Sequence, residues 1–263
     1  WKGTEILGKQ REEKLVFSGD GIGGFTCVME YPDPLGGNRY AMLISGKSDA
    51  SSHGDMRTQT LSAHLPMLFH PNPKNVMVVG LASGVTAGEV LCYPVDQLDV
   101  LEINKQVVEA SRFFLPWNNQ VLKDPRTRLI IQDARAHLQL TRQTYDVIIS
   151  EPSNPWMAGL AALFTCDFFQ LARERLKPDG LFVQFFHSYE MDWATFALVG
   201  RSFAHVFPNS VLAVTEPVGY GYDYLLVGFN GSRSLQSETA QQNFIYAQKS
   251  SNIRLVNPFL FYR

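Results

Sequence analysis

The chain has 263 residues, of which 45% are hydrophobic and 18% are charged, and its formal net charge is −2. This length accommodates one large α/β domain and a small additional one. The near-neutral charge excludes the strongly basic surface that is typical of nucleic-acid binding, and no block of Lys and Arg marks a membrane-binding surface.

The first 50 residues predict a small β unit. Residues 24–31 and 39–45 are β-rich segments, and a Pro- and Gly-rich turn separates them. The pattern then changes, because residues 56–70 carry apolar side chains at helical spacing. Pro66 is expected to cap or kink this helix.

From residue 75 onward, apolar strands alternate with amphipathic helices. Strands are expected at 75–80, 97–103, 128–133, 145–151, 181–186, 211–216 and 222–229. Helices are expected at 86–94, 105–114, 134–141, 166–176 and 193–207. This alternation predicts an α/β fold with a parallel sheet that is covered on both faces. The tail from Gly231 receives no assignment.

Three cysteines, Cys27, Cys92 and Cys166, are isolated and lack the spacing of metal ligands. They are typical of a reducing compartment, so we expect a cytoplasmic protein without a bound metal. No apolar run approaches the ~18 residues that a membrane span needs, so the chain is expected to be soluble. Because it starts at Trp1, the sequence leaves open that it is a fragment of a longer protein.

The ends of the predicted strands carry the candidate site, because ligands of open α/β sheets bind beyond the carboxyl ends of the strands. The first of these strands ends in GLASGVTAG. Gly80 and Gly84 allow the backbone to approach a ligand closely, and a helix N-terminus follows. An ordinary tight turn explains the same glycines equally well.

Three acids end the next three strands. Glu102 follows Gly80 at about the 20-residue spacing where a nucleoside ribose is hydrogen-bonded. Asp133 is placed to accept from an adenine amino group and also to cap the following helix. Glu151 ends the fourth strand, within SEPSNPW. A glycine turn and three acids in series favour an adenosine-containing ligand.

The type of adenosine ligand follows from what the motif lacks. No phosphate-binding Lys and no full G-x-G-x-x-G are present, which disfavours ATP and NAD. Carboxylates attract a cation, so a sulfonium compound of the S-adenosylmethionine type is favoured.

Six motifs follow one another along the chain: GKSDASSHGDMRTQTLSAHLPMLFHPNP, VMVVGLASGVTAG, DVLEIN, FFLPWNN, DPRTRLIIQDAR and YDVIISEPSNPWMAGLAALFTCDFFQLA. In this order, from Gly46 to about Phe229, they resemble the spermidine synthase (aminopropyltransferase) family. The likeness is greatest to bacterial members that are fused to a multi-span membrane region.

The resemblance implies a small N-terminal β domain at residues 1–55 and a Rossmann-like S-adenosylmethionine-dependent methyltransferase fold at 56–230. A C-terminal tail then covers 231–263. It also leaves open a homodimer and, in a longer protein, a tether to the inner membrane.

The same resemblance implies that decarboxylated S-adenosylmethionine donates an aminopropyl group to a small amine, with methylthioadenosine as the by-product. S-adenosylmethionine and methylthioadenosine remain alternative ligands. The attacking amine must lose a proton, since protonated alkylamines have pKa values near 10.4. A carboxylate can hold the cationic amine, orient it and receive this proton.

Residue roles are carried over by position. Glu151 takes the place of the catalytic aspartate in the family's Asp-Ser-Ser-Asp-Pro loop. The donor is expected to be bound by Gln59, His64, Gly80, Ser83, Gly84, Glu102, Asp133 and Ala134.

The acceptor pocket has its own candidates, and two of them have a plain structural alternative. They are Asn154, Trp156, His187 and Tyr222, with Asp223 beside the last. His187 is either a base or a structural histidine, and Trp156 is either a pocket wall or a core residue. Asp49, His53 and Asp55 form either a gate over the acceptor or a solvated loop.

Three departures from the family keep other functions open. Ser83 replaces an aspartate that binds the donor amine, Asn154 replaces the second acid of the catalytic loop, and Thr58 replaces a tyrosine. Ser83 leaves room for a donor carboxylate, so an S-adenosylmethionine-dependent methyltransferase is one alternative. A non-catalytic nucleoside-binding domain of a membrane protein is the other.

Overall fold

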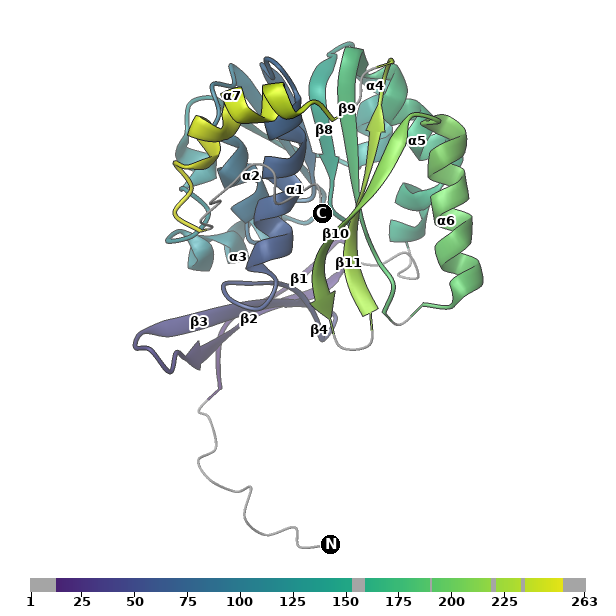
Figure 1. Cartoon of the computed structure of the whole chain (residues 1–263). Helices are drawn as coiled ribbons and strands as arrows, with labels where there is room; N and C mark the ends of the chain where they lie inside the picture. Colours follow the sequence, from purple (N-terminus) through teal and green to yellow (C-terminus); the bar gives the residue numbers. More distant parts are fainter. Residues whose placement is uncertain (1–12, 153–158, 190, 219–220, 233–234, 253–263) are drawn as a thin grey trace, which may run out of the picture.

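The computed structural model describes residues 13–152, 159–189, 191–218, 221–232 and 235–252 (Figure 1). They form a four-stranded antiparallel sheet and a larger seven-stranded sheet with helices on both faces. The α/β fold with a small N-terminal β unit is therefore confirmed. In this part of the chain, no helix has the length and apolar character that crossing a membrane requires.

The small sheet has the order β1-β2-β3-β4. Its strands are β1 (Lys14–Gly21), β2 (Gly24–Pro32), β3 (Asn38–Ile44) and β4 (Lys47–Ser51). Sequence patterns found β2 and β3 but missed β1 and β4. Most side chains of β1 are exposed, so this strand lacks a buried apolar run from which to recognise it.

The large sheet has the order β10-β11-β9-β8-β5-β6-β7. Its strands are β5 (Asn75–Val79), β6 (Gln97–Glu102), β7 (Thr127–Ile131), β8 (Tyr145–Ser150), β9 (Leu176–His187), β10 (Ser210–Val218) and β11 (Gly221–Phe229). Five consecutive strands, from β9 to the edge strand β7, are parallel, as predicted. The prediction was wrong at one edge, where β11 runs antiparallel to β9 and β10. The short β10–β11 connection forms a hairpin, because no crossover helix intervenes.

Helices cover both faces of the large sheet (Figure 1). The α-helices are α1 (Met56–Phe69), α2 (Val85–Val90), α3 (Lys105–Ala110), α4 (Ala134–Leu140), α5 (Cys166–Glu174), α6 (Trp193–Val206) and α7 (Ser237–Ala247). The 3₁₀ turns are η1 (Ser111–Phe114), η2 (Val121–Lys123) and η3 (Leu160–Phe164). Successive residues of a strand face opposite sides: Val76 and Val78 pack with α1 to α3 and α7, whereas Met77 and Val79 pack with α4 to α6.

Helix α1 lies at the centre of one helical layer. Every residue from Thr58 to Phe69 is buried, because α1 packs against α2, α7 and four strands of the sheet. Pro66 lies inside this helix, which continues to Phe69, so Pro66 does not cap it. Burial on all sides outweighs the missing backbone donor of this proline.

The C-terminal tail contains a helix that the sequence patterns missed. Helix α7 packs on α1, and the buried side-chain amide of Asn243 donates to the carbonyls of Leu68 (3.0 Å) and His70 (2.7 Å). The last carbonyls of a helix lack partners within it, so Asn243 satisfies the end of α1.

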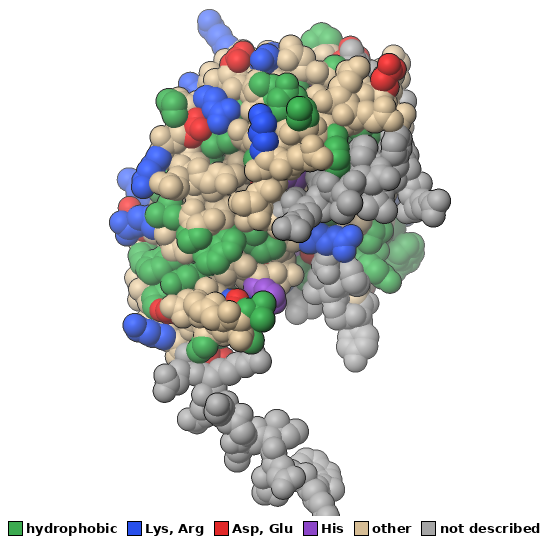
Figure 2. Space-filling view, turned by 60° about the vertical axis from the view of Figure 1, so that its left-hand side comes forward, with side chains coloured by type: hydrophobic (Ala, Val, Ile, Leu, Met, Phe, Trp, Pro, Cys, Tyr) green, Lys and Arg blue, Asp and Glu red, His purple; other side chains and the backbone are tan. Residues whose placement is uncertain are grey.

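On the face drawn in Figure 2, basic side chains are scattered among acidic and hydrophobic ones.

Candidate functional site

Two cavities adjoin at the carboxyl ends of the central strands. We name the one of about 300 Å³ the sheet-edge cavity and the one of about 400 Å³ the acidic cavity. Asp49, Ala82 and Glu151 line both. The two volumes are in the range of small-molecule sites. A ligand with two parts can therefore place its junction at Glu151.

The glycine turn after β5 forms the floor of the sheet-edge cavity. Gly80 has φ +91°, a conformation that favours glycine. Ala82 has φ +44°, which is uncommon for a residue with a side chain. Such left-handed residues cluster at ligand sites, where the surrounding fold holds them in place. The turn thus brings bare backbone to the point where the cavities meet.

Glu102 and Asp133 line the sheet-edge cavity, as the sequence predicted. Glu102 accepts hydrogen bonds from the backbone N–H groups of Leu81 (3.0 Å) and Asn104 (2.8 Å), which fix its orientation. Burial raises the pKa of Glu102, and the nearby charge of Asp49 acts in the same direction. Asp133 accepts from the N–H of Ala136 and caps α4, so its structural role is confirmed.

Four carboxyl groups line the acidic cavity. Asp49 comes from β4, Asp55 precedes α1, Asp223 comes from β11 and Glu151 follows β8. Thr58 donates to Asp223 (2.7 Å) and thereby orients it. Because like charges repel at close range, this cavity favours a cationic ligand.

The surroundings of Glu151 shift its pKa strongly from the ordinary value. Burial raises its pKa to about 8, and the charges of Asp55, Asp49 and Asp223 contribute to the rise, although the hydrogen bond to Thr86 opposes it. The residue is half-buried and lines both cavities. Near neutral pH it is therefore poised between acid and carboxylate, which is the condition for proton transfer.

Gln59 lines the acidic cavity. Ser83 and Gly84, which were also predicted to bind the aminopropyl donor, lie outside it. Ser83 donates to the side-chain oxygen of Gln59, and the Gln59 amide donates to the carbonyl of Ser51 (3.0 Å). Gly84 caps α2 with φ +83° and faces Asn118. Neither Ser83 nor Gly84 lines either of the two cavities, and both belong to the turn between β5 and α2. Ala134 lines the sheet-edge cavity as predicted.

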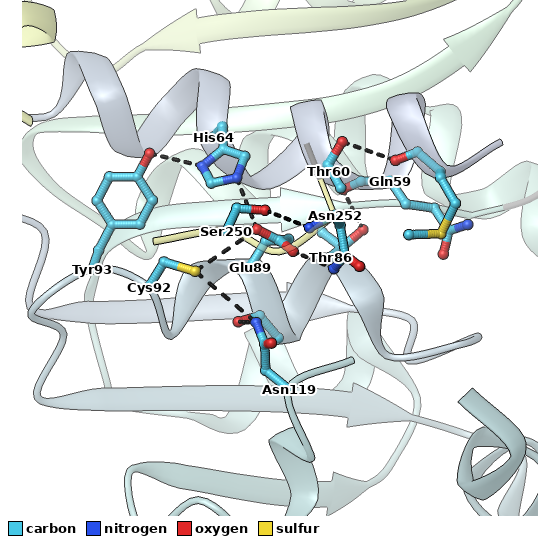
Figure 3. A network of polar contacts seen from close by, with 12 residues as sticks. Gln59, Thr60, His64, Thr86, Glu89, Cys92, Tyr93, Asn119, Ser250 and Asn252 are labelled. Carbon is cyan, nitrogen blue, oxygen red and sulfur yellow. Dashed lines mark hydrogen bonds and ion pairs between the residues drawn. The ribbon is translucent and has the colours of Figure 1, made fainter. Parts of the chain in front are cut away.

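The side chain of His64 lies away from the two cavities. Its ring is fully buried between α1 and α2, where it contacts Glu89 (2.8 Å) and the hydroxyl of Tyr93 (2.9 Å), and it lines neither cavity (Figure 3). Asn252, beyond α7, also donates to Glu89. The sequence missed Glu89 because its burial depends on the packing of α1 against α2.

The residues predicted for the acceptor pocket lie in different environments. His187 is buried, contacts the carbonyl of Tyr189 (3.0 Å) and lines neither cavity, so the structural reading applies. Tyr222 is exposed and its neighbour Asp223 faces the acidic cavity instead, because successive strand residues point to opposite sides. Asn154 and Trp156 lie outside the described residues.

Other residues of the acidic cavity received no individual role from the sequence. Lys47, Thr86 and Phe185 line this cavity, as does Tyr189, which the strand end before it had made a candidate for the acceptor pocket. Lys47 and Thr86 belong to the motifs described above, but only the fold brings these residues together. In the described part of the chain, no group of three or more His, Cys, Asp or Glu has the geometry of a metal site.

Comparisons with known proteins agree with this geometry. The family model of the spermine/spermidine synthase domain matches residues 56–226. A polyamine aminopropyltransferase of Thermotoga petrophila is 29% identical over 198 residues, covering 74% of this chain and 65% of that protein. One of Caldicellulosiruptor saccharolyticus is 36% identical over 168 residues, covering 64% and 60%.

A solved structure with a similar fold agrees with this family match. A spermidine synthase in complex with the transition-state analogue AdoDATO superimposes with a TM-score of 0.74 at 26% identity, over 88% of this chain and 85% of that one. This chain spans less than two thirds of the length of the two relatives described above.

Proposed function

We propose that this chain, which belongs to the spermine/spermidine synthase family, transfers an aminopropyl group from decarboxylated S-adenosylmethionine to a small amine. The observation that carries the proposal is the position of Glu151, where a cavity suited to a nucleoside meets a cavity lined by acids. This arrangement suits a donor that joins an adenosine to a positively charged, reactive sulfonium.

In this proposal the sheet-edge cavity holds the nucleoside. Glu102 accepts from the ribose hydroxyls, since a carboxylate can accept more hydrogen bonds than its two backbone contacts supply. Asp133 accepts from the adenine amino group. The backbone of the turn from Gly80 to Ala82 closes on the donor from below.

The acidic cavity holds the amine acceptor. Its carboxyl groups orient a protonated amine near Glu151, and Glu151 removes a proton from the attacking nitrogen. The nitrogen lone pair forms the new bond to the carbon beside sulfur. The carbon–sulfur bond breaks, and sulfur keeps the electron pair as a neutral thioether. The proton remains on Glu151 until it passes to solvent.

Product analysis tests this function directly. Purified protein that is incubated with decarboxylated S-adenosylmethionine and a panel of di- and polyamines should release methylthioadenosine. No release with any amine would refute the proposal. Release of S-adenosylhomocysteine from S-adenosylmethionine would favour the methyltransferase alternative instead.

Calorimetry provides a second test. The carboxylate of S-adenosylmethionine is repelled by the acids around Glu151, so the decarboxylated donor should bind more tightly. Equal affinities would remove the electrostatic argument for an aminopropyl donor.

Glu102→Gln should weaken the binding of methylthioadenosine by about 10- to 100-fold, because a hydrogen bond to a charged group contributes about 1.5–3 kcal/mol. In addition, the side-chain N–H group of glutamine cannot accept a hydrogen bond, so the backbone N–H of Leu81 or Asn104 loses its acceptor. Isothermal calorimetry measures the affinity, with the exposed Glu109→Gln as the control. Unchanged affinity would place the ribose elsewhere.

The larger organisation of the protein is also a proposal. We place domain boundaries near residues 55 and 230, and the motif resemblance supports a membrane region and a homodimer in the complete protein. Limited proteolysis tests the boundaries and light scattering tests the dimer. The sequence of the full-length protein tests the membrane region.

A further inference from the structure

Thr86 joins the proposed reactive group to the central helix. Its hydroxyl oxygen lies 2.9 Å from the backbone carbonyl oxygen of Gln59 in α1 and 2.5 Å from Oε2 of Glu151. Thr86 itself is in the first turns of α2 and is buried. Three separate elements therefore meet at one hydroxyl group. In Figure 3, Thr86 and Gln59 lie to the right of the buried pair of His64 and Glu89.

Counting protons restricts how these contacts form. A threonine hydroxyl carries one hydrogen and can also accept, whereas a carbonyl oxygen can only accept. An ionised carboxylate can likewise only accept. If Thr86 donates to Gln59, its contact with Glu151 is a hydrogen bond only when Glu151 is a carboxylic acid that donates to Thr86. If Glu151 is ionised, the single hydrogen of Thr86 turns to it.

We propose that Thr86 is a positioning residue that holds the Glu151 carboxyl group in both of its protonation states. In the empty cavity, Glu151 is an acid that donates to Thr86, and Thr86 donates to Gln59. When a cationic acceptor enters, Glu151 releases its proton, and the hydroxyl of Thr86 rotates to donate to the carboxylate. The identity of the occupant rests on the proposed function, whereas the empty state does not.

The rotation leaves no buried group unsatisfied. In an α-helix, the carbonyl of residue 59 also accepts from the N–H of residue 63, so Gln59 keeps one bond when Thr86 turns away. The carboxyl oxygen of Glu151 keeps its partner throughout. The hydroxyl can therefore follow the proton at low cost, and the carboxyl group stays in one place.

The charges around Glu151 favour the acid form of the empty site. Asp49 on β4, Asp55 before α1 and Asp223 on β11 raise its pKa, in addition to burial. Lys47 on β4 and Tyr189 after β9 line the same cavity. Glu102 and Asp133 line the adjoining one. A cation among these groups stabilises the carboxylate and reverses the preference.

Infrared difference spectroscopy of the ligand-free protein tests the first half of the proposal. At pH 7 the wild-type spectrum should contain a carboxylic-acid carbonyl band that is absent from Glu151→Gln. Thr86→Val should shift this band in the direction of a weaker hydrogen bond, and Thr86→Ser should restore it. Circular dichroism checks that both variants fold. Absence of the band, or a band that Thr86→Val leaves unchanged, would overturn the assignment.

Calorimetry with 1,4-diaminobutane tests the second half. In buffers of different ionisation enthalpy at pH 7, binding should release close to one proton per chain from wild type and none from Glu151→Gln. In Thr86→Val the release should move to higher pH, because the carboxylate has lost a donor, and Thr86→Ser should behave as wild type. Binding without proton release would overturn the switch. A normal infrared result without diamine binding would instead overturn the proposed acceptor.

Discussion

Glu151→Gln is expected to lower kcat by about 10²- to 10⁴-fold, the usual contribution of a general base. Glutamine has nearly the same size and still fits beside Thr86, but it cannot take a proton from the attacking amine. The affinity for methylthioadenosine should stay close to that of wild type, because in the proposed function Glu102 and the glycine turn, not Glu151, hold the nucleoside. Steady-state release of methylthioadenosine and calorimetry measure the two effects. A variant that keeps its turnover would remove Glu151 from the reaction.

The same substitution has a signature in stability that checks its cause. The pKa of Glu151 in the folded protein is about 8, which lies above its ordinary value, so ionisation of this group destabilises the fold. The penalty starts above the ordinary pKa of a glutamate and grows until the pH reaches about 8. Glu151→Gln should therefore melt at a higher temperature than wild type, by a margin that increases from pH 5 to pH 8. A margin independent of pH would contradict the raised pKa.

Glu89→Ala is expected to reduce the free energy of unfolding by about 3–5 kcal/mol, because it leaves the buried His64 and the other donors to Glu89 without their partner. Glu89 and His64 are 2.8 Å apart, and both side chains have 0% exposure. Burial alone would raise the pKa of Glu89, but the interaction with His64 and the hydrogen bonds from Ser250 and Asn252 together outweigh it, and the pKa is lowered. Urea unfolding at pH 7 measures the loss.

Two controls separate this pair from an ordinary surface contact. Glu109 pairs with Arg112 across an exposed turn, so Glu109→Ala should change the unfolding free energy by less than ~1 kcal/mol. Because the pKa of Glu89 is lowered, its contribution is present above the ordinary glutamate pKa and disappears as the pH falls below the folded value. The difference between Glu89→Ala and wild type should therefore shrink in acid. An equal loss at pH 7 and in acid would mean that the charge is unimportant.

The strand ends could be predicted from the sequence because parallel strands bring their carboxyl ends to one edge. Gly80, Glu102, Asp133 and Glu151 needed only strand positions to be placed together, and all four line the cavities. The antiparallel edge was not predictable in this way, since β11 is as apolar as a parallel strand. The direction of β11 depends on its short connection to β10, and hydrophobic periodicity carries no information about the direction of a strand.

Residues that act across elements were harder to place. His64 has the spacing of a site residue, but the packing of α1 against α2 turns it toward Glu89. Asp49, Asp55 and Asp223 are far apart in the chain, and only the approach of β4 and β11 makes one acidic surface of them. Thr86 belongs to the motif after β5, but its contact with Glu151 could not be predicted, because it depends on the position of Glu151. Sequence spacing records local geometry, and these contacts are not local.

The hydrogen bonds from Asn243 to the end of α1 also affect when this helix can be completed during synthesis. Residues 56–69 leave the ribosome some 170 residues before the amide that completes them, so α1 must wait with its last carbonyls unpaired. Contacts of such long sequence separation form slowly. The nascent chain therefore exposes the apolar surface of its central helix until Asn243 has emerged, and such exposed surface favours aggregation.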